Sequence, residues 1–189
     1  MTDLVRIERD QGVARVTLNR PELNNALNAE LIAQLHAALE GIAKDASIAT
    51  VVLAGEGKSL CAGADINEMR KAGDYSREDN IKHALPLARL LATLDRMPQT
   101  TVGRAQGPIY GGGIGVGIVP AMISPYVVRA IGERTARRYF QTAEVFDAHE
   151  AHRIGLLHEV VAADALDERL AKMLRQLKSA APGARGAAK

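Results

Sequence analysis

Two glycine-rich turns are the segments of this sequence best suited to chemistry. The first, residues 61–65, reads Cys-Ala-Gly-Ala-Asp, and the second, residues 110–113, reads Tyr-Gly-Gly-Gly. Each follows an apolar, β-branched run. Turns of this kind leave backbone N–H groups that can point at a ligand, with the positive end of a following helix behind them. Two such turns brought together would stabilise a developing oxyanion, whereas either turn alone is better explained by tight packing or by positive φ angles.

The other reactive side chains suggest no competing site. Cys61 is the only cysteine, which excludes an internal disulfide and a multi-cysteine metal site, and it is expected to be a small buried residue. The glycine triplet 111–113 fails the dinucleotide-binding fingerprint and lacks the Lys-Ser/Thr pair of a P-loop. The histidines show no metal-ligand spacing. The acids Glu133, Glu144 and Asp147 are expected to be solvated on helix surfaces.

Composition limits the class of protein. The 189 residues are 47% hydrophobic, which suits one domain with a single core, and the formal net charge is only +2. Aromatic residues make up 3% and tryptophan is absent, so unstacked bases would find little surface and no nucleic-acid partner is expected. RNA binding through the arginines of 129–138 stays a weak alternative to a solvated helix face. Because there is no apolar leader and no run long enough for a membrane span, we expect a cytoplasmic protein.

Apolar periodicity predicts an α/β fold around the two turns. The alternating pattern of residues 4–19 indicates a hairpin of two edge-like strands, and the continuous apolar run 49–54 suits a strand buried on both faces. Asn28 is placed to cap one helix, and Ser76 with Asp79 resembles a capping box that starts another. The predicted strands are 4–19 (as a hairpin), 49–54, 100–102 and 156–161, and the predicted helices are 31–42, 76–97, 126–131, 134–142, 148–154 and 165–180.

A series of motifs extends along nearly the whole chain. They read NRP at 19–21 with NNAL at 24–27, CAGADI at 61–66, QGP at 106–108 with GGG at 111–113, and shorter matches at 117–120, 131–132, 146–148 and 155–156. In this order they resemble the signatures of the enoyl-CoA hydratase/isomerase (crotonase) family. The resemblance implies a ClpP/crotonase-like fold of repeated ββα units, with a core over residues 1–125 and a helical C-terminal region over 126–189. The ISPY sequence at 123–126 is similar to the branch that acts on methylglutaconyl-CoA.

The resemblance also implies a site and a reaction. The backbone N–H groups of Ala64 and Gly112 are expected to donate to the thioester oxygen of an acyl-CoA substrate, during syn addition of water to a 2-enoyl-CoA. No metal or redox cofactor is implied, and the expected assembly is a homotrimer or a dimer of trimers. Asp65 is expected to cap a helix beginning near Ile66. The residues implied to hold the CoA moiety are Ala26, Ala62, Gly63, Asp65, Ile66 and Gly111.

The sequence departs from the family pattern at the positions where the catalytic glutamate is expected. Many hydratases carry a glutamate two residues after the glycine triplet, where this chain has Gly115, and a second glutamate lies beyond the following helix. Here Val116 follows at once, so that a helix, a connection and a strand of roughly 20–25 residues are missing. A helix starting at Gly112 would meet Pro120 after about two turns, with three glycines inside it, and would hardly form. Further C-terminal helices of the family are expected beyond Lys189.

Two explanations compete for the direct connection of Gly115 to Val116, which is called the join at 115–116 below. Either the sequence omits part of a longer enzyme, or the gene product has lost the segment, and the well-formed flanks favour omission. The expected function is an enoyl-CoA hydratase. A Δ3,Δ2-enoyl-CoA isomerase shares the oxyanion hole and needs only proton transfer. A non-catalytic acyl-CoA-binding protein is the alternative if the deletion is real.

Overall fold

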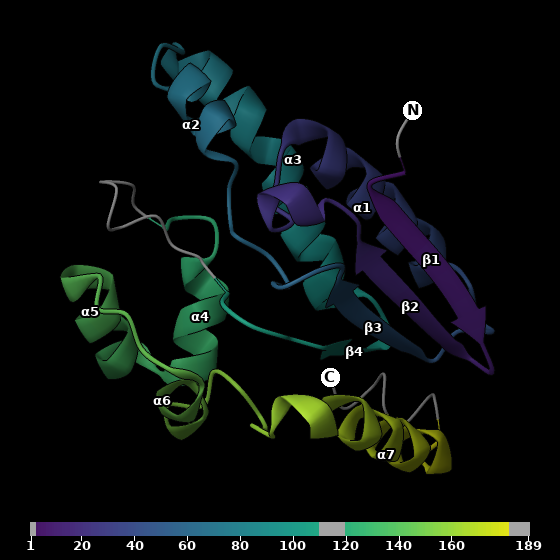
Figure 1. Ribbon diagram of the computed structural model, residues 1–189. Coiled ribbons are helices and arrows are strands. Elements are labelled where there is room, and N and C mark those ends of the chain that lie inside the picture. Colours follow the sequence, from purple (N-terminus) through teal and green to yellow (C-terminus); the bar gives the residue numbers. More distant parts are fainter. Residues whose placement is uncertain (1–2, 110–119, 182–189) are drawn as a thin grey trace. The chain divides into compact units, whose positions relative to one another are not determined.

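The computed structural model describes residues 3–109 and 120–181. The chain forms two compact units, which are Met1–Tyr110 together with Asp167–Lys189, and Gly111–Leu166. The first unit contains a four-stranded mixed sheet, and the described part of the second is built from short helices (Figure 1). The described elements are β1 (Val5–Asp10), β2 (Val13–Leu18), the 3-10 helix η1 (Pro21–Leu23), α1 (Ala29–Ala43), β3 (Thr50–Gly55), α2 (Ile66–Ala72), α3 (Arg77–Arg96), β4 (Thr100–Gly103), α4 (Ser124–Ile131), α5 (Glu133–Thr142), α6 (Ala148–Arg153), the 3-10 helix η3 (Ala163–Ala165) and α7 (Leu166–Ser179).

The sheet has the order β1-β2-β3-β4, and only its first pair is antiparallel. The predicted hairpin is confirmed, with Gln11 and Gly12 in its turn at φ angles of 45° and 80°. The prediction of two edge strands is wrong for β2, which pairs in parallel with β3 along its whole length. Alternation shows that one face of a strand is buried, but it does not distinguish an edge strand from an interior strand.

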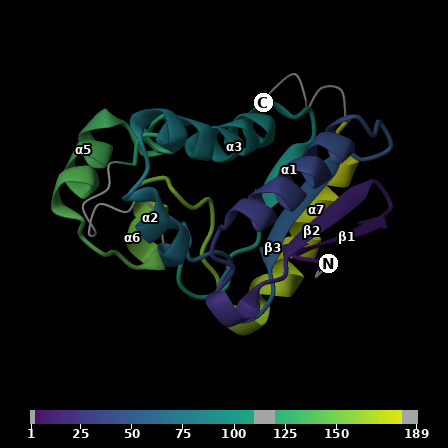
Figure 2. The same ribbon diagram turned by 90° about the horizontal axis from the view of Figure 1, so that it is seen from above.

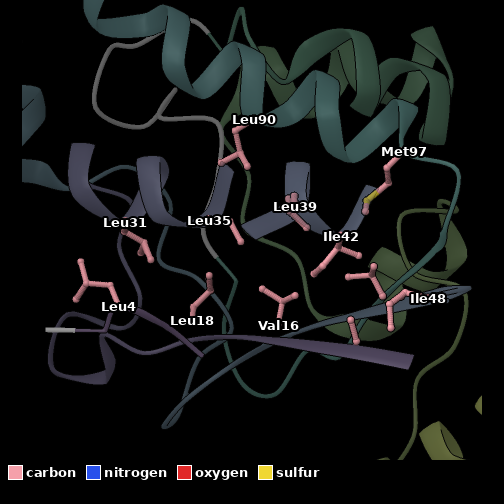
Figure 3. Close-up of a cluster of buried hydrophobic side chains, with 12 residues drawn as sticks. Leu4, Val16, Leu18, Leu31, Leu35, Leu39, Ile42, Ile48, Leu90 and Met97 are labelled. Atoms are coloured by element: carbon pink, nitrogen blue, oxygen red, sulfur yellow. The ribbon is translucent and has the colours of Figure 1, made fainter. Parts of the chain in front are cut away.

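The main hydrophobic core lies between the sheet and α1. Asn28 caps α1 as predicted, because its side chain accepts a hydrogen bond of 2.9 Å from the Leu31 N–H. Apolar side chains at helical spacing then point from α1 toward the strands, and α3 closes the cluster from the other side of α1 (Figure 3). The buried members are Leu4, Ala14, Val16, Leu18, Leu31, Leu35, Leu39, Ile42, Ile48, Val51, Leu90 and Met97.

The opposite face of the sheet is covered by α7 (Figures 1 and 2). Val51 of β3 belongs to the core on the α1 side, and its neighbour Val52 is fully buried as well. Successive strand residues face opposite sides of a sheet, so cover on both faces explains the continuous apolar run of β3. Arg104, just after β4, donates two hydrogen bonds of 2.7 and 3.0 Å to the Asp167 carboxylate of α7.

The long helix α3 begins at the predicted capping box. The Ser76 hydroxyl accepts a hydrogen bond from the Asp79 N–H (3.1 Å) and donates to the Asp79 carboxylate (2.7 Å). These bonds satisfy a backbone donor that the first helical turn leaves unpaired. Within the described ranges, no helix is both long enough and apolar enough to cross a membrane.

The second unit is held together by a buried tyrosine. Tyr139 of α5 is 8% exposed, and its ring lies 4.6 Å from the Phe146 ring, centroid to centroid. Its hydroxyl donates to Glu150 of α6, which also accepts two hydrogen bonds from the Arg153 guanidinium. The N–H of Arg153 and the hydroxyl of Tyr139 both stabilise the charged carboxylate, and they lower the pKa of Glu150 to about 2.

The strand predicted at 156–161 is wrong. The N–H groups of Leu156 and Leu157 both donate to the Ala151 carbonyl, at 2.8 and 3.1 Å, so this backbone closes a turn after α6. Gly155, at a φ angle of 86°, makes the change of direction possible. Short apolar runs cannot be assigned to strand or loop by periodicity alone, and here the local turn is formed instead.

Candidate active site

The first glycine-rich turn lies beside the segment that precedes α1. Leu27 and Ala64 form an isolated parallel β-bridge. The Leu27 N–H donates to the Gly63 carbonyl (2.8 Å), and the Leu27 carbonyl accepts from the Asp65 N–H (3.0 Å). Ala64 lies between Gly63 and Asp65, whose backbone groups bond to Leu27. In such a parallel bridge the N–H and carbonyl of the middle residue point away from the partner strand. The Ala64 N–H therefore points away from Leu27.

That N–H group is available to a ligand. Across the parts of the chain that the structure describes, the Ala64 N–H has no hydrogen-bond partner, and Ala64 is exposed. Backbone donors that remain unpaired in a folded protein usually bond to water or to a ligand. The geometry thus provides one unpaired backbone donor, on an exposed residue, at the position where the sequence predicts half of an oxyanion hole.

Asp65 fixes the end of this turn. One carboxylate oxygen, Oδ1, accepts from the Asn67 N–H (2.8 Å), which confirms the predicted cap of α2. The other oxygen, Oδ2, accepts a 2.6 Å bond from Nη1 of Arg20, and the two side chains are only 7% and 13% exposed. The hydrogen bond from Arg20 holds the pKa of the Asp65 carboxyl below its ordinary value, so Asp65 is charged at neutral pH.

Asn25 connects the same region to the end of β3. Its side chain is fully buried and accepts from the Arg20 N–H at 2.8 Å. Its amide nitrogen donates to the carbonyls of Glu56 (3.0 Å) and Ser59 (2.8 Å). All the polar atoms of this amide are therefore paired. The hydrogen bonds offset the free-energy cost of burying a polar side chain, and they fix the path of the loop.

The segment that leads to the second glycine-rich turn runs beside the first. The Ser59 hydroxyl donates to the Pro108 carbonyl, and the Gln106 amide donates to the Gly55 carbonyl. A Cβ on Gly107 would lie 2.1 Å from the Lys58 carbonyl oxygen, so only glycine permits this close approach. Gly111 and Gly112, together with the join at 115–116, lie outside the described residues.

A family model described as enoyl-CoA hydratase/isomerase matches residues 8–119 and 114–189 of the chain. The chain belongs to this family. A Thermus thermophilus protein that carries a provisional enoyl-CoA hydratase name is 31% identical over 216 aligned positions, covering 95% of this chain and 85% of that protein. Enoyl-CoA hydratase ACTT6 of Alternaria alternata is 31% identical over 92% of this chain, which spans 64% of the ACTT6 length.

A crystal structure confirms the predicted fold class. A Legionella pneumophila protein, provisionally described as an enoyl-CoA hydratase/isomerase (crotonase), superposes with a TM-score of 0.91 at 30% identity, over 98% of this chain and 80% of that one. The α/β crotonase fold, with a mixed sheet and seven α-helices among the described residues, is therefore established.

The remaining residues predicted for the family's site lie along the described turn. Ala26 is 9% exposed, and the Ala62 N–H donates to the Asn24 carbonyl at 2.9 Å. Gly63 has a φ angle of 81°, which suits glycine. Ile66, the first residue of α2, is 62% exposed. Ala26 and Ala62 thus support the turn, whereas Ala64 and Ile66 are exposed at the surface.

Sequence reasoning missed the supporting roles of Arg20 and Asn25. Both residues belong to motifs, but an arginine 45 positions from its carboxylate partner leaves no periodic signal in the sequence. The NRP and NNAL motifs are the features that could have directed attention to them, since polar residues next to a turn often pair with backbone.

Proposed function

We propose that this chain is an enoyl-CoA hydratase that holds a 2-enoyl-CoA thioester against the Ala64 N–H. The observation that carries the proposal is the N–H of the exposed residue Ala64, which the Leu27–Ala64 bridge turns away from Leu27 and which has no partner within the part of the chain that the structure describes. Membership of the enoyl-CoA hydratase/isomerase family supports it.

The proposed reaction is syn addition of water to the conjugated double bond. The oxygen of water forms a bond to the β-carbon while one of its O–H protons passes to the acid–base group, the π electrons move toward the thioester oxygen, and a proton from the acid–base group is then added at the α-carbon. Negative charge gathers on the thioester oxygen, where the N–H groups of Ala64 and Gly112 are proposed to stabilise it. Removal of one such donor typically costs ~3–4 kcal/mol of transition-state stabilisation.

The CoA part of the substrate is proposed to lie along Ala26, Ala62, Gly63, Ile66 and Gly111. Asp65 is placed in this group through its backbone. Its carboxylate is occupied by Arg20 and Asn67 and is 7% exposed, which leaves it little access to a ligand. The proposal includes no metal and no redox cofactor, because hydration of a conjugated thioester needs only acid, base and electrostatic stabilisation.

The acid–base group is proposed to be a glutamate in the segment that the join at 115–116 lacks. The alignment with the Thermus relative supports a missing segment, because its 216 positions exceed the 189 residues of the chain and must include residues without a counterpart here. The match to the family model also divides into two parts that meet at residues 114–119.

Product analysis tests the function. Crotonyl-CoA should be converted into a 3-hydroxyacyl-CoA, which identifies a hydratase. Conversion of 3-enoyl-CoA into 2-enoyl-CoA without a hydroxylated product would identify the isomerase alternative. Binding of CoA thioesters without turnover would identify a non-catalytic acyl-CoA-binding relative.

The substrate branch and the assembly are further parts of the proposal. ISPY at 123–126 supports a branched substrate such as methylglutaconyl-CoA, and α4 begins within this motif. The proposed assembly is a homotrimer or a dimer of trimers. A higher kcat/KM for methylglutaconyl-CoA than for crotonyl-CoA would support the branch, and light scattering of the purified protein measures the subunit count.

A further inference from the structure

One guanidinium nitrogen connects both sides of the bridge that orients Ala64. Arg20 lies two residues after the end of β2 and immediately before Pro21 of η1. Its Nη1 donates to the Ala26 carbonyl at 2.8 Å and to Oδ2 of Asp65 at 2.6 Å. The side chain is 13% exposed, so both bonds are largely shielded from water.

The two acceptors are the immediate neighbours of the bridge partners. Ala26 precedes Leu27 on one side, and Asp65 follows Ala64 on the other. Among the described residues, the two segments are joined by the two backbone bonds of Leu27 and by one from the Ala62 N–H to the Asn24 carbonyl, whereas a strand within a sheet is held by a longer ladder. With so few backbone bonds, side-chain links contribute strongly to the register of the bridge. Arginine suits this role, because its donors are planar and rigid and remain charged at every physiological pH.

We propose that Arg20 is a positioning residue, which sets the direction of the Ala64 N–H by holding Ala26 and Asp65 at a fixed separation. This inference rests on the proposed function, in which that N–H stabilises the thioester oxygen. The geometry of such a donor must be maintained closely, because a displacement of about 1 Å can cost about 10² in rate. Arg20 itself does not touch the substrate.

The test uses butyryl-CoA labelled with ¹³C at the thioester carbonyl. This saturated thioester has no double bond to hydrate, and its carbonyl resonance moves downfield when the oxygen accepts stronger hydrogen bonds. The Kd for free CoA and the thermal midpoint are measured beside it. The variants are Arg20→Gln and Arg20→Lys, and Ile42→Val, in the core, is the control for lost stability.

Arg20→Gln should lose a clear part of the downfield displacement, since the Gly112 donor is not altered, while the Kd for free CoA stays within about three-fold of the parent value. Arg20→Lys should recover only part of it, because an ammonium keeps the charge but lacks the planar arrangement of donors. Ile42→Val should lower the thermal midpoint and leave the displacement unchanged. Where turnover is measurable, kcat of Arg20→Gln should fall about ten- to a hundred-fold.

Arg20→Gln leaves the Asp65 carboxylate buried without its partner and can fail to fold. The double variant Arg20→Gln/Asp65→Asn removes both charges, and it should fold but still show a reduced displacement. A folded Arg20 variant, single or double, that keeps the full displacement would overturn the positioning role alone. A parent protein without any downfield displacement would overturn the proposed function, and the positioning role with it.

Discussion

At the residue scale, the proposed activity depends on a backbone group. Ala64 contributes an N–H, and its methyl side chain has no part in the chemistry, so the determinants of the site are the residues that orient the peptide. Leu27 supplies the bridge, Asp65 supplies the helix cap, and Arg20 connects the two. Substitutions of these neighbours are therefore more informative than substitution of Ala64.

Asp65→Asn separates a supporting role from a catalytic one. An amide offers one acceptor oxygen where the carboxylate uses two, so one of the bonds from Arg20 and Asn67 is lost. We expect the free energy of unfolding to fall by about 1–3 kcal/mol, measured by denaturant titration. The kcat on crotonyl-CoA should fall less than about ten-fold, because no proton passes through this group and the remaining amide oxygen can still accept from Arg20. A folded variant with turnover lowered by several orders of magnitude would make Asp65 catalytic.

Gly112→Val tests the second proposed donor. A Cβ at this position would crowd the thioester or displace the N–H. Binding of free CoA should not change much, because free CoA has no thioester oxygen that bonds to this donor. We expect kcat to fall about 10²–10³-fold, with the Kd for CoA within a few-fold of the parent. Near-normal kcat would contradict the oxyanion role. A collapse of the thermal midpoint would show that this glycine serves packing instead.

At the element scale, the sequence predicted the features that are set by local patterns. Asn28 and Ser76 are standard cap residues in front of apolar periodicity, and both helices begin where these residues indicate. β3 was recognisable because burial on both faces leaves an uninterrupted apolar run. The turn at 61–66 was found through its motif, and the cap by Asp65 followed from its position before Ile66.

Features that depend on distant pairing could not be predicted in this way. The interior place of β2 is decided by β3, which lies more than 30 residues further along the chain. The ion pair between Arg20 and Asp65 forms only when two loops meet. The run at 156–161 has the composition of a strand, yet Leu156 and Leu157 find a closer partner in Ala151. In each case a tertiary contact decides between local conformations that the sequence allows equally.

Acidity should weaken the link between α5 and α6. The pKa of Glu150 is lowered to about 2 from an ordinary value of 4.5, so its contribution to stability is complete above pH 4.5 and is lost as the pH falls toward 2. We expect the thermal midpoint of the parent to fall more steeply across this window than that of Glu150→Gln, measured by circular dichroism. Parallel pH profiles of the two proteins would show that the contacts with Tyr139 and Arg153 do not stabilise the fold.

At the scale of the whole molecule, the join at 115–116 is the decisive feature. The described residues supply one donor, its supports and the segment leading to the second turn, and the proposed glutamate belongs to the segment that the join lacks. We expect the intact mass of the natural protein to exceed 20.2 kDa, measured by mass spectrometry. A mass of 20.2 kDa would mean that the deletion is real and would favour the non-catalytic alternative.

Replacement of the Ala64 amide by an ester tests the central claim most directly. An α-hydroxy acid incorporated at position 64 removes this N–H and keeps the methyl side chain, and the same change at Gly63 is a control that leaves the Ala64 N–H and both bonds of Leu27 in place. The measurement is the ¹³C shift of labelled butyryl-CoA bound to each protein. We predict a clear loss of the downfield displacement with the ester at position 64, and a displacement close to the parent value with the ester at Gly63. Equal displacement in all three proteins would contradict the assignment of the Ala64 N–H to the thioester oxygen.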